Sequence, residues 1–465
     1  MKFTEKVIIG LEVHIELNTQ SKLFCTCPTT GEEAPNTRVC PTCLGHPGSK
    51  PIVNKAAIEK GIKLALATEC SIAPSLVFSR KSYFYPDLAK NYQITQYEEP
   101  LGKEGSLTIE GGKSVGIERI HLEEDPAALV HMPVFCLADY NRNGNPLVEL
   151  VTKPEMYSPE EARAFMKKLK TILLYLGIFD ENGGVIKADA NISIKESEYT
   201  RVEIKNITGF REIERALFHE VERQQLITKE GREIVQETRG WDAQKGLTYP
   251  MRMKETEADY GYILDPDLVP ITIDDSWIAK LKKQVPELAD AKTERFTKLG
   301  VEEIDAQVLA QNKDIADLFD KVAVHIHPAL AARWIRREVV RVLHFAKKSL
   351  AESSISPSQL IELLHLVEQK RITEKVAQKL MEELVVEHFE VKTRVEERGL
   401  SAVSDENAIG KSCDEAIKEN KKAVDDFKAG NEKSFNFLVG QVMKKTKGKA
   451  SPDVIKGILV KKLNS

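Results

Sequence analysis

Apolar and polar residues alternate along several segments in the first half of the chain, and this period of two predicts β-strands. In residues 10–17 every second residue is apolar, while Glu12, His14 and Glu16 stand between them. Further alternating strands are expected at residues 114–124, 185–195 and 201–207. Because successive side chains of a strand point to opposite faces, each segment is predicted to bury one face and to present a polar one.

The second half of the chain has a different pattern, with apolar residues three or four positions apart, as in amphipathic helices. Helices are expected at residues 277–284, 301–321, 329–348, 357–368 and 373–389, and two short ones near the end of the chain. Earlier helices are predicted at residues 54–67 and 159–176. The second has Ser158 as its N-cap, Glu161 completing a capping box and Gly177 as its stop.

These patterns predict an α+β protein, in which a large mixed-sheet cradle domain is followed by an all-helical domain and a small helical tail. We place the cradle in residues 1–290, the helical domain in 291–400 and the tail in 401–465, and 465 residues suffice for separate cores. No apolar run approaches the roughly 20 residues of a membrane span. The first residues lack the layout of a signal peptide, so we expect a cytoplasmic protein.

Four of the seven cysteines form two closely spaced pairs, Cys25 with Cys27 and Cys40 with Cys43. Thiolates at these spacings can surround one zinc ion tetrahedrally, and a shell of four sulfur atoms is typical of a structural site. The residues between the pairs are polar and rich in Pro, Thr and Gly, as expected of a metal-held loop. The alternative is a redox role for Cys40 and Cys43 alone, which leaves the other pair without a function.

The polar faces of the predicted strands carry carboxylates, amides, lysines and a histidine. Asp189, Asn191 and Lys205 join Glu12 and His14 in this set. Oxygen ligands and cations in one place are what a magnesium and phosphate site requires. The alternative is a surface lattice of salt bridges.

A loop at residues 79–93 mixes cations with aromatic residues, among them Lys81, Tyr83, Tyr85 and Lys90. Such a loop suits an anionic and planar ligand such as a nucleotide, through ion pairing and stacking, and a packed aromatic loop is the alternative. The sequence has no Gly-rich phosphate loop of the Walker type and no kinase signature. Nucleotide chemistry is therefore expected on a sheet platform.

Two charge features add to this picture. Glu149 stands among apolar residues at 146–151, where a carboxylate requires either a sheet edge or a bound cation. The formal net charge is −4, but residues 431–465 carry eight lysines and two acidic residues, a local balance of +6. This end is expected to meet phosphates, unless its lysines only decorate exposed helix faces.

Several longer motifs occur along nearly the whole chain. They are Gly-Leu-Glu-Val-His at residues 10–14, Arg-Lys-Ser-Tyr-Phe-Tyr-Pro-Asp at 80–87, Asp-Tyr-Asn-Arg at 139–142, Asp-Ala-Asn at 189–191, Glu-Ile-Lys-Asn at 203–206 and Phe-Leu-Val-Gly-Gln-Val-Met-Lys at 437–444. In this order they resemble the B subunits of heterotrimeric aspartyl/glutamyl-tRNA(Asn/Gln) amidotransferases. The number and order of the motifs make the resemblance highly specific.

The resemblance implies an ATP-dependent carbon–nitrogen ligase with divided labour. In this family misacylated Asp-tRNA(Asn) or Glu-tRNA(Gln) is held by the B subunit, which phosphorylates the side-chain carboxylate with ATP and Mg²⁺. The A subunit releases ammonia from glutamine to complete the amidation, and a small C subunit ties A to B. Phosphorylation is needed because a carboxylate is a poor electrophile. Neither DNA nor a membrane is an expected partner.

The resemblance also implies roles for single residues. The expected magnesium ligands are Glu12, His14, Glu124 and Glu149, with Asp189 as a further oxygen ligand. The expected zinc ligands are Cys25, Cys27, Cys40 and Cys43. Phosphate oxygens are expected to meet Lys81, Lys90, Arg142 and Lys205, beside Tyr83 and Tyr85 of the nucleotide loop. The residues expected to act in the reaction itself are Glu12, His14, Glu124, Lys81 and Lys205.

Two departures from the family pattern keep rival interpretations open. Residues 126–128 replace the usual Ala-Gly-Lys, and Gly261 stands in place of an arginine, so two expected cations are missing. The departure at 126–128 keeps a non-catalytic tRNA-binding scaffold open as an alternative, which the retained Glu12, His14, Glu124 and Glu149 disfavour. The related E subunit of the archaeal Glu-specific enzyme carries an additional domain, for which 465 residues leave no obvious space.

Overall fold

The computed structural model describes residues 7–31, 33–181, 183–251, 261–402, 406–428, 431–446 and 448–464. It divides into two compact units, Met1–Leu288 and Ala289–Ser465. All of the described strands belong to the first unit, and the second is helical, which confirms the predicted fold class. No described helix combines the length and the apolar character that crossing a lipid bilayer requires.

A nine-stranded sheet organises the first unit, in the order β14-β13-β12-β11-β1-β10-β7-β6-β2. Its strands are β1 (Val7–Glu16), β2 (Ser71–Ile72), β6 (Gly102–Thr108), β7 (Ser114–Glu124), β10 (Pro146–Thr152), β11 (Ile186–Ile194), β12 (Val202–Thr208), β13 (Glu237–Asp242) and β14 (Leu247–Pro250). β12 and β13 pair in parallel and the other neighbours are antiparallel, so the sheet is mixed. The predicted strands are confirmed to within a few residues.

Three helices cover one face of this sheet, α1 (Lys55–Ala67), α2 (Pro159–Leu176) and α3 (Phe210–Lys229). Asn54 caps α1, because its side chain accepts hydrogen bonds from the Ala56 and Ala57 N–H groups of the first turn. Ser158 and Gly177 bound α2 as predicted, but the capping box is wrong, since the Glu161 carboxylate accepts from Tyr157 N instead. The helices bury the apolar side of the strands, including Val13 and Ile15 of β1, which are fully buried.

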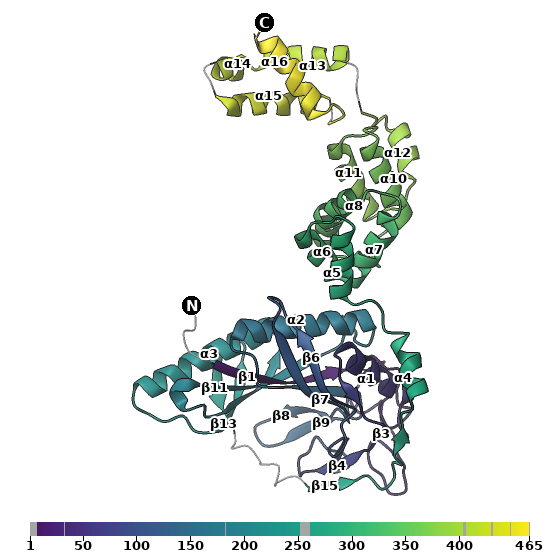
Figure 1. Ribbon diagram of the computed structural model, residues 1–465, viewed down its shortest axis with the longest axis vertical. Coiled ribbons are helices and arrows are strands. Elements are labelled where there is room, and N and C mark those ends of the chain that lie inside the picture. The colour runs from purple at the N-terminus through teal and green to yellow at the C-terminus, as the bar shows by residue number, and fades with distance from the viewer. Residues whose placement is uncertain are drawn as a thin grey trace. The chain divides into compact units, whose positions relative to one another are not determined.

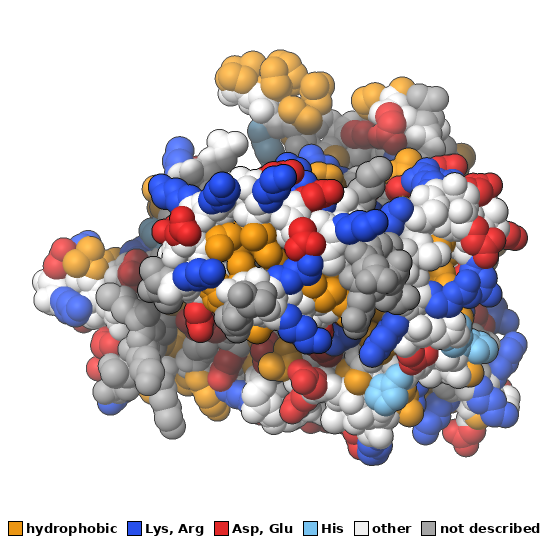
Figure 2. Space-filling model, turned by 90° about the horizontal axis from the view of Figure 1, so that it is seen from above, with side chains coloured by type: hydrophobic (Ala, Val, Ile, Leu, Met, Phe, Trp, Pro, Cys, Tyr) orange, Lys and Arg blue, Asp and Glu red, His pale blue; other side chains and the backbone are white. Residues whose placement is uncertain are grey.

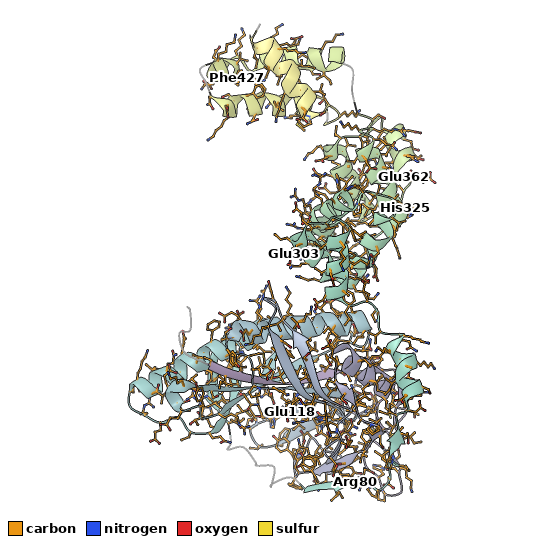
Figure 3. All side chains as sticks on the ribbon, viewed as in Figure 1. Arg80, Glu118, Glu303, His325, Glu362 and Phe427 are labelled. Carbon is orange, nitrogen blue, oxygen red and sulfur yellow. The ribbon has the colours of Figure 1, made fainter. Side chains whose placement is uncertain are left out.

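Smaller sheets lie on the other side of the nine-stranded sheet (Figure 1). They comprise β4 (Ser79–Ser82), β5 (Tyr92–Thr95) and β15 (Gly261–Leu264), the hairpin β8 (Ala128–His131) and β9 (Cys136–Asp139), and the pair β3 (Ser75–Leu76) and β16 (Ile271–Thr272), before α4 (Asp275–Lys282). Arg80, labelled in Figure 3, fastens β4 by ion pairs to Asp265 and Asp267. The polar face of the large sheet therefore lies toward these loops and hairpins.

The second unit begins with a run of helices. They are α5 (Ala289–Lys298), α6 (Glu303–Ala310), α7 (Lys313–Ala323), α8 (Pro328–Trp334), α9 (Val340–Ala346), α10 (Pro357–Glu368), α11 (Glu374–Leu384) and α12 (Val391–Glu397). The single helix predicted at 301–321 is wrong, because Asn312 caps a new helix by accepting a hydrogen bond from Ile315 N. The helix predicted at 329–348 is interrupted by a π-helical turn, Ile335–Val339.

The end of the chain packs around a small core of its own. Its helices are α13 (Glu406–Glu419), α14 (Lys421–Lys428), α15 (Glu432–Lys445) and α16 (Pro452–Asn464). Leu438, Val442, Ile455 and Leu459 are fully buried among them. Of the eight lysines of the basic end, Lys447 lies outside the described residues.

The molecular surface mixes charges of both signs. On the face drawn in Figure 2, Lys and Arg side chains are interspersed with Asp and Glu side chains. Within the basic end, Lys445 pairs with Glu415 and Glu419, and Lys462 pairs with Asp414. Part of the positive charge predicted from the sequence is therefore balanced by acidic residues of α13.

Candidate active site

Strand register brings polar side chains of the large sheet into a row. β1 lies between β10 and β11, so that His14 is opposite Glu149 on one side and Lys187 on the other. Glu149 is in turn opposite His121 of β7. Side chains directly opposite one another in an antiparallel pair start about 5 Å apart and are therefore in reach of each other.

Five side chains of this row and its neighbours converge. Nε2 of His14 lies 3.5 Å from a carboxylate oxygen of Glu149 and 3.5 Å from one of Glu123. Nε2 of His121 lies 3.3 Å from Glu149 and 3.7 Å from Glu123. Glu12 completes the group, with Oε1 3.8 Å from the His14 ring. We call these five residues the carboxylate–imidazole cluster.

The electrostatics of the cluster favour charged imidazoles. Burial lowers the pKa of His14, but a hydrogen bond with Glu149 and the nearby carboxylates outweigh it and raise the pKa to about 10. Burial is likewise outweighed by Glu149 and Glu123 at His121, whose pKa is raised to about 9. Burial raises the pKa of Glu149, but the two imidazoles hold it well below its usual range. The raised pKa values favour the protonated form of both imidazoles, which balances negative charge on the neighbouring carboxylates.

The cluster is open at one side. The side chains of Glu12 and His14 are 29% and 24% exposed, whereas those of Glu123, Glu149 and His121 are 6–9% exposed. A ligand can therefore reach the cluster from the side of Glu12 and His14. The more buried residues would hold it from beneath.

The donor set fits a divalent cation. Ligand atoms of Glu12, His14 and Glu149 lie within 4.8 Å of one another, and so do those of His121, Glu123 and Glu149. Carboxylate oxygens suit hard cations such as Mg²⁺, and imidazole nitrogens bind metals once their proton is released. Among the residues that the structure describes, none forms a hydrogen bond with the buried Nδ1 atom of His121.

Asp189 and Lys205 continue the polar face beside Glu12. Glu12 is opposite Asp189 in the β1–β11 register, and Asp189 accepts a hydrogen bond from Nζ of Lys205 at 2.8 Å. Burial lowers the pKa of Lys205, but Asp189 and Glu203 outweigh it and raise the pKa above its usual value. Burial, Glu149 and Asp189 raise the pKa of Glu12. The structure thus places a lysine ammonium next to the open side of the cluster.

The structure does not bring Glu124 into the cluster. It follows Glu123 on β7 and so points to the opposite face of the strand, where both carboxylate oxygens lie 2.6 Å from Nζ of Lys90. Its Oε1 also accepts a hydrogen bond from Ile94 N. Glu124, Lys90 and Ile94 line a pocket together with Tyr92 and with Cys25 and Cys43 of the cysteine loop, residues 25–43. The predicted set of Glu12, His14, Glu124 and Glu149 is therefore not assembled, and Glu123 takes the position that Glu124 was expected to fill.

The remaining predicted cations lie in different surroundings. Arg142 pairs with Asp125 at 3.0 Å and donates to the carbonyl groups of Pro126 and Ala127, so a cation does lie beside the departure at 126–128. Burial raises the pKa of Asp125 to about 6, although Arg142 opposes it. Lys81 lies on β4, in the separate three-stranded sheet. Tyr83 and Tyr85 follow it in the loop after β4.

His121 and Glu123 were missed by the sequence-based interpretation, although a signal for both was present. They alternate on the predicted strand 114–124 with apolar residues, as Glu12 and His14 do on theirs. The alternation does not reveal the register of the strands. It is the register that places this polar face next to Glu149 and His14.

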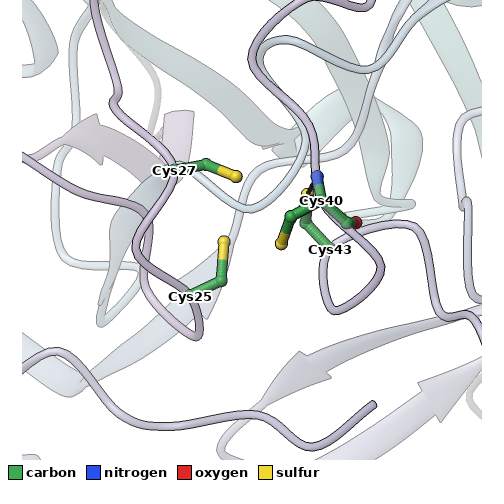
Figure 4. A group of neighbouring side chains, drawn as sticks. All are labelled: Cys25, Cys27, Cys40 and Cys43. Atoms are coloured by element: carbon green, nitrogen blue, oxygen red, sulfur yellow. Dashed lines mark hydrogen bonds between the residues drawn. The ribbon is translucent and has the colours of Figure 1, made fainter. Parts of the chain in front are cut away.

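The four cysteines predicted as zinc ligands do converge. Figure 4 shows the sulfur atoms of Cys25, Cys27, Cys40 and Cys43 pointing toward a common centre, and all four lie within 4.8 Å of one another. The Cys40 and Cys43 sulfur atoms are 3.9 Å apart. In a tetrahedral zinc site with bonds of about 2.3 Å, sulfur atoms are separated by about 3.8 Å. The group therefore fits a metal such as zinc.

The surroundings of the cysteines differ from one sulfur to the next. A hydrogen bond from Cys25 lowers the pKa of the Cys43 thiol to about 5 against the opposing effect of burial, with a further contribution from Lys22. Burial raises the pKa of Cys27 to about 11. A hydrogen bond with Cys43 and burial raise the pKa of Cys25. Because the pKa is lowered at Cys43 and raised at Cys25 and Cys27, Cys43 is the one of these three thiols that most readily carries negative charge.

Comparison with known proteins places the chain in a family. A family model described as the GatB/GatE catalytic domain matches residues 7–279, and one described as the GatB domain matches residues 317–463. Among similar proteins is the B subunit of the aspartyl/glutamyl-tRNA(Asn/Gln) amidotransferase of Caldanaerobacter subterraneus, 43% identical over 99% of both chains. The chain belongs to this B-subunit family.

Other members of the B-subunit family show the same level of similarity. Proteins of the same name from Thermodesulfovibrio yellowstonii and Geobacter sulfurreducens are each 44% identical, over 98% of this chain and 98–99% of their own. The match to the catalytic-domain model includes both the carboxylate–imidazole cluster and the four cysteines. The family assignment predicted from the motifs is therefore confirmed, and the chain is a subunit of an amidotransferase enzyme.

Proposed function

We propose that this chain activates the side-chain carboxylate of misacylated Asp-tRNA(Asn), Glu-tRNA(Gln) or both by phosphorylation with ATP, and that the acyl phosphate is then converted to an amide. The observation that supports the proposal is the carboxylate–imidazole cluster, a solvent-accessible set of cation ligands in the family's catalytic domain. The relatives are named aspartyl/glutamyl-tRNA(Asn/Gln) amidotransferase subunits, which supports a tRNA substrate and the transfer of an amide group.

The proposed reaction has two steps. A carboxylate oxygen of the aminoacyl group attacks the γ-phosphorus of ATP, and the bond to the bridging oxygen breaks, which releases ADP. Ammonia then attacks the acyl carbon, phosphate leaves and a proton is lost, which gives the amide. The ammonia would come from glutamine on an A subunit, and a small C subunit would make the enzyme a heterotrimer in the cytoplasm.

We assign magnesium binding to Glu12, His14 and Glu149, with Glu123 and His121 as additional ligands from beneath. When bound, magnesium offsets negative charge on the phosphate oxygens. Lys205, held by Asp189 beside Glu12, would meet the phosphate or the incoming carboxylate. The imidazolium protons of His14 and His121 would leave as the cation enters, since a protonated imidazole cannot act as a ligand.

We also propose roles for the cations and aromatic residues outside the cluster. Lys90 would act together with its partner Glu124, so that Glu124 positions a cation instead of binding magnesium. Arg142 would supply positive charge beside residues 126–128. Lys81, Tyr83 and Tyr85 are proposed contacts of the nucleotide.

The helical unit is the proposed support for tRNA. We retain residues 291–400 as a helical domain and 401–465 as a tail that meets tRNA phosphates, a role supported by exposed lysines on α15 and α16. The lysines chosen for a test are Lys433, Lys444, Lys456 and Lys461. Recognition would depend on the shape and phosphates of the RNA. Replacing the four lysines with glutamate should weaken tRNA binding and flatten its salt dependence, whereas an unchanged dissociation constant would remove this role.

The test of the activation step omits glutamine. The reconstituted heterotrimer, given ATP, Mg²⁺ and misacylated tRNA, should release ADP and form an acyl phosphate, which hydroxylamine traps as a side-chain hydroxamate that does not form without ATP. Each misacylated tRNA is tested in turn, which also measures the substrate preference. ATP turnover without hydroxamate would contradict the proposed intermediate. The absence of both, with tRNA still bound, would favour the non-catalytic scaffold.

A further inference from the structure

Lys22 is completely buried although it carries a charge. Its exposed fraction is 0%, and it is among the largest fully buried side chains of the first unit. Nζ lies 3.2 Å from the carbonyl oxygen of Tyr140 and 3.9 Å from Sγ of Cys43. Among the described residues, no carboxylate lies within 4.0 Å of this ammonium, so an ordinary ion pair does not account for its burial.

The carboxylates of Glu124 and Asp267 line the pocket beside Lys22, and both are already paired with other cations. Glu124 lines this pocket together with Lys22, but both of its oxygens lie 2.6 Å from Nζ of Lys90. A buried ammonium without a counter-charge is costly in free energy. The groups left to balance Lys22 are therefore the sulfur atoms of the cysteine loop.

The charge of a filled cysteine site supplies what Lys22 lacks. Four thiolates around one Zn²⁺ carry a net charge of about −2, which is itself costly in a partly buried position unless a cation or N–H donors lie nearby. Cys43, the buried member of the four, receives the Cys40 backbone N–H at 3.2 Å as well as Lys22. An ammonium beside this sulfur offsets half of the net charge.

We propose that Lys22 is the charge partner of the metal–tetrathiolate centre and thereby a positioning residue for the loop at residues 139–145. The inference rests on the four cysteines binding a metal such as zinc, which their geometry fits. It assigns to Lys22 two simultaneous contacts, one with a metal-bound sulfur and one with the Tyr140 carbonyl. Substituting Lys22 would therefore change both the metal affinity and the order of this loop.

Other contacts support the link between the metal centre and this loop. Asn143 donates from its side chain to the Cys43 carbonyl at 2.7 Å, and Leu23 N donates to the Gly144 carbonyl at 2.8 Å. The same loop carries Arg142, which pairs with Asp125. Lys22 therefore lies where the cysteine loop and a segment next to the polar sheet face meet.

The experiment measures zinc affinity of the full-length chain by competition with a chromophoric chelator. Lys22→Met should bind zinc about ten- to a hundred-fold more weakly than the natural chain, the usual effect of removing a residue that contacts a metal ligand. Lys22→Gln keeps a donor for the Tyr140 carbonyl but loses the charge, so it should show a similar loss. Lys153→Met, which removes a lysine paired with Glu104 away from the cysteine loop, is the matched control.

A spectroscopic measurement separates this role from a general loss of stability. With cobalt in place of zinc, the sulfur-to-metal charge-transfer band should shift to lower energy in Lys22→Gln, because a cation next to the thiolate stabilises its electrons. Amide hydrogen exchange at residues 139–145 should also become faster. An unchanged zinc affinity and an unchanged band in Lys22→Gln would overturn the proposal, and that variant decides the question if Lys22→Met does not fold.

The outcomes distinguish this inference from the site on which it depends. A natural chain that binds no zinc would remove the cysteine metal site itself. A natural chain that binds zinc, with Lys22→Gln equally tight, would leave the metal site in place and remove only the role of Lys22.

Discussion

The two groups of candidate metal ligands in the first unit are built in opposite ways. The four cysteines come from one loop segment, residues 25–43, and their spacing in the sequence already brings them within reach of one ion. The carboxylate–imidazole cluster takes its residues from β1, β7 and β10, which are more than a hundred residues apart at the extremes. A local ligand set can be inferred from spacing, whereas a set spread over a sheet depends on which strands pair and in which register.

The two groups also differ in how they satisfy charge. The cluster balances its carboxylates with its own imidazoles, whose pKa values are raised by the carboxylates. The cysteine site has a buried cation beside it, Lys22. The first arrangement can exchange protons for a metal and suits a site that binds and releases ligands. The second suits a permanently filled structural site.

The largest expected effect is at the shared residue of the cluster. Glu149→Gln should lower the rate of amide formation by the reconstituted enzyme on the order of a hundred- to a thousand-fold, because Glu149 contacts both His14 and His121. Steady-state assays with misacylated tRNA measure this loss. Glu104→Gln, which changes an exposed carboxylate paired with Lys153, is the control and should keep its activity. Full activity in Glu149→Gln would exclude the cluster from the reaction.

Removing one sulfur atom from the four-cysteine group should lower the stability of the protein. Cys43→Ser is expected to lower the unfolding free energy by about 3 kcal/mol, or Tm by about 10 °C, because it removes a ligand that holds the loop closed. Calorimetry in the presence of zinc measures the shift. Cys136→Ser, on the half-buried strand β9 and outside the four-cysteine group, is the matched control. A Tm equal to that of the natural chain would show that the loop is held without metal.

Glu123 and Glu124, which are neighbours on β7, should differ in their contribution to metal affinity. Glu123→Gln is expected to weaken Mn²⁺ binding, as a probe for Mg²⁺, about tenfold, since Glu123 lies 3.5 Å from His14. Glu124→Gln should leave this affinity within about twofold, because Glu124 faces Lys90 on the other side of the strand. Calorimetric titration of both variants compares them directly. The reverse order would show that the predicted set with Glu124 is the functional one.

The smallest effect is expected at the contact between the cysteine loop and its neighbour. Asn143→Ala should cost about 1 kcal/mol of unfolding free energy, because the buried Asn143 amide donates to the Cys43 carbonyl. Chemical denaturation measures it. Asn18→Ala, at an exposed hydrogen bond to the Gly177 carbonyl, should change the free energy by less. Equal effects would show that burial of the loop contact has no special weight.

Much of the fold was predictable from local patterns. The strand expected at 114–124 and the helix at 357–368 agree with β7 and α10 residue for residue, since alternation and a Ser-Pro start are strong local signals. The break at Asn312 was not predicted, although an Asn before a run of helix formers is a capping signal. There the apolar spacing continued across the break and concealed it.

The sequence by itself determined the fold class, the family and the four-cysteine group, because these depend on local periodicity, on the order of motifs along the chain and on the spacing of the cysteines. The tertiary structure alone decided that Glu123 and His121 join His14 and Glu149, and that Glu124 faces Lys90. The physical reason is the period of two in a strand. A shift of one residue moves a side chain to the opposite face, and only the pairing of distant strands shows which face meets which partner.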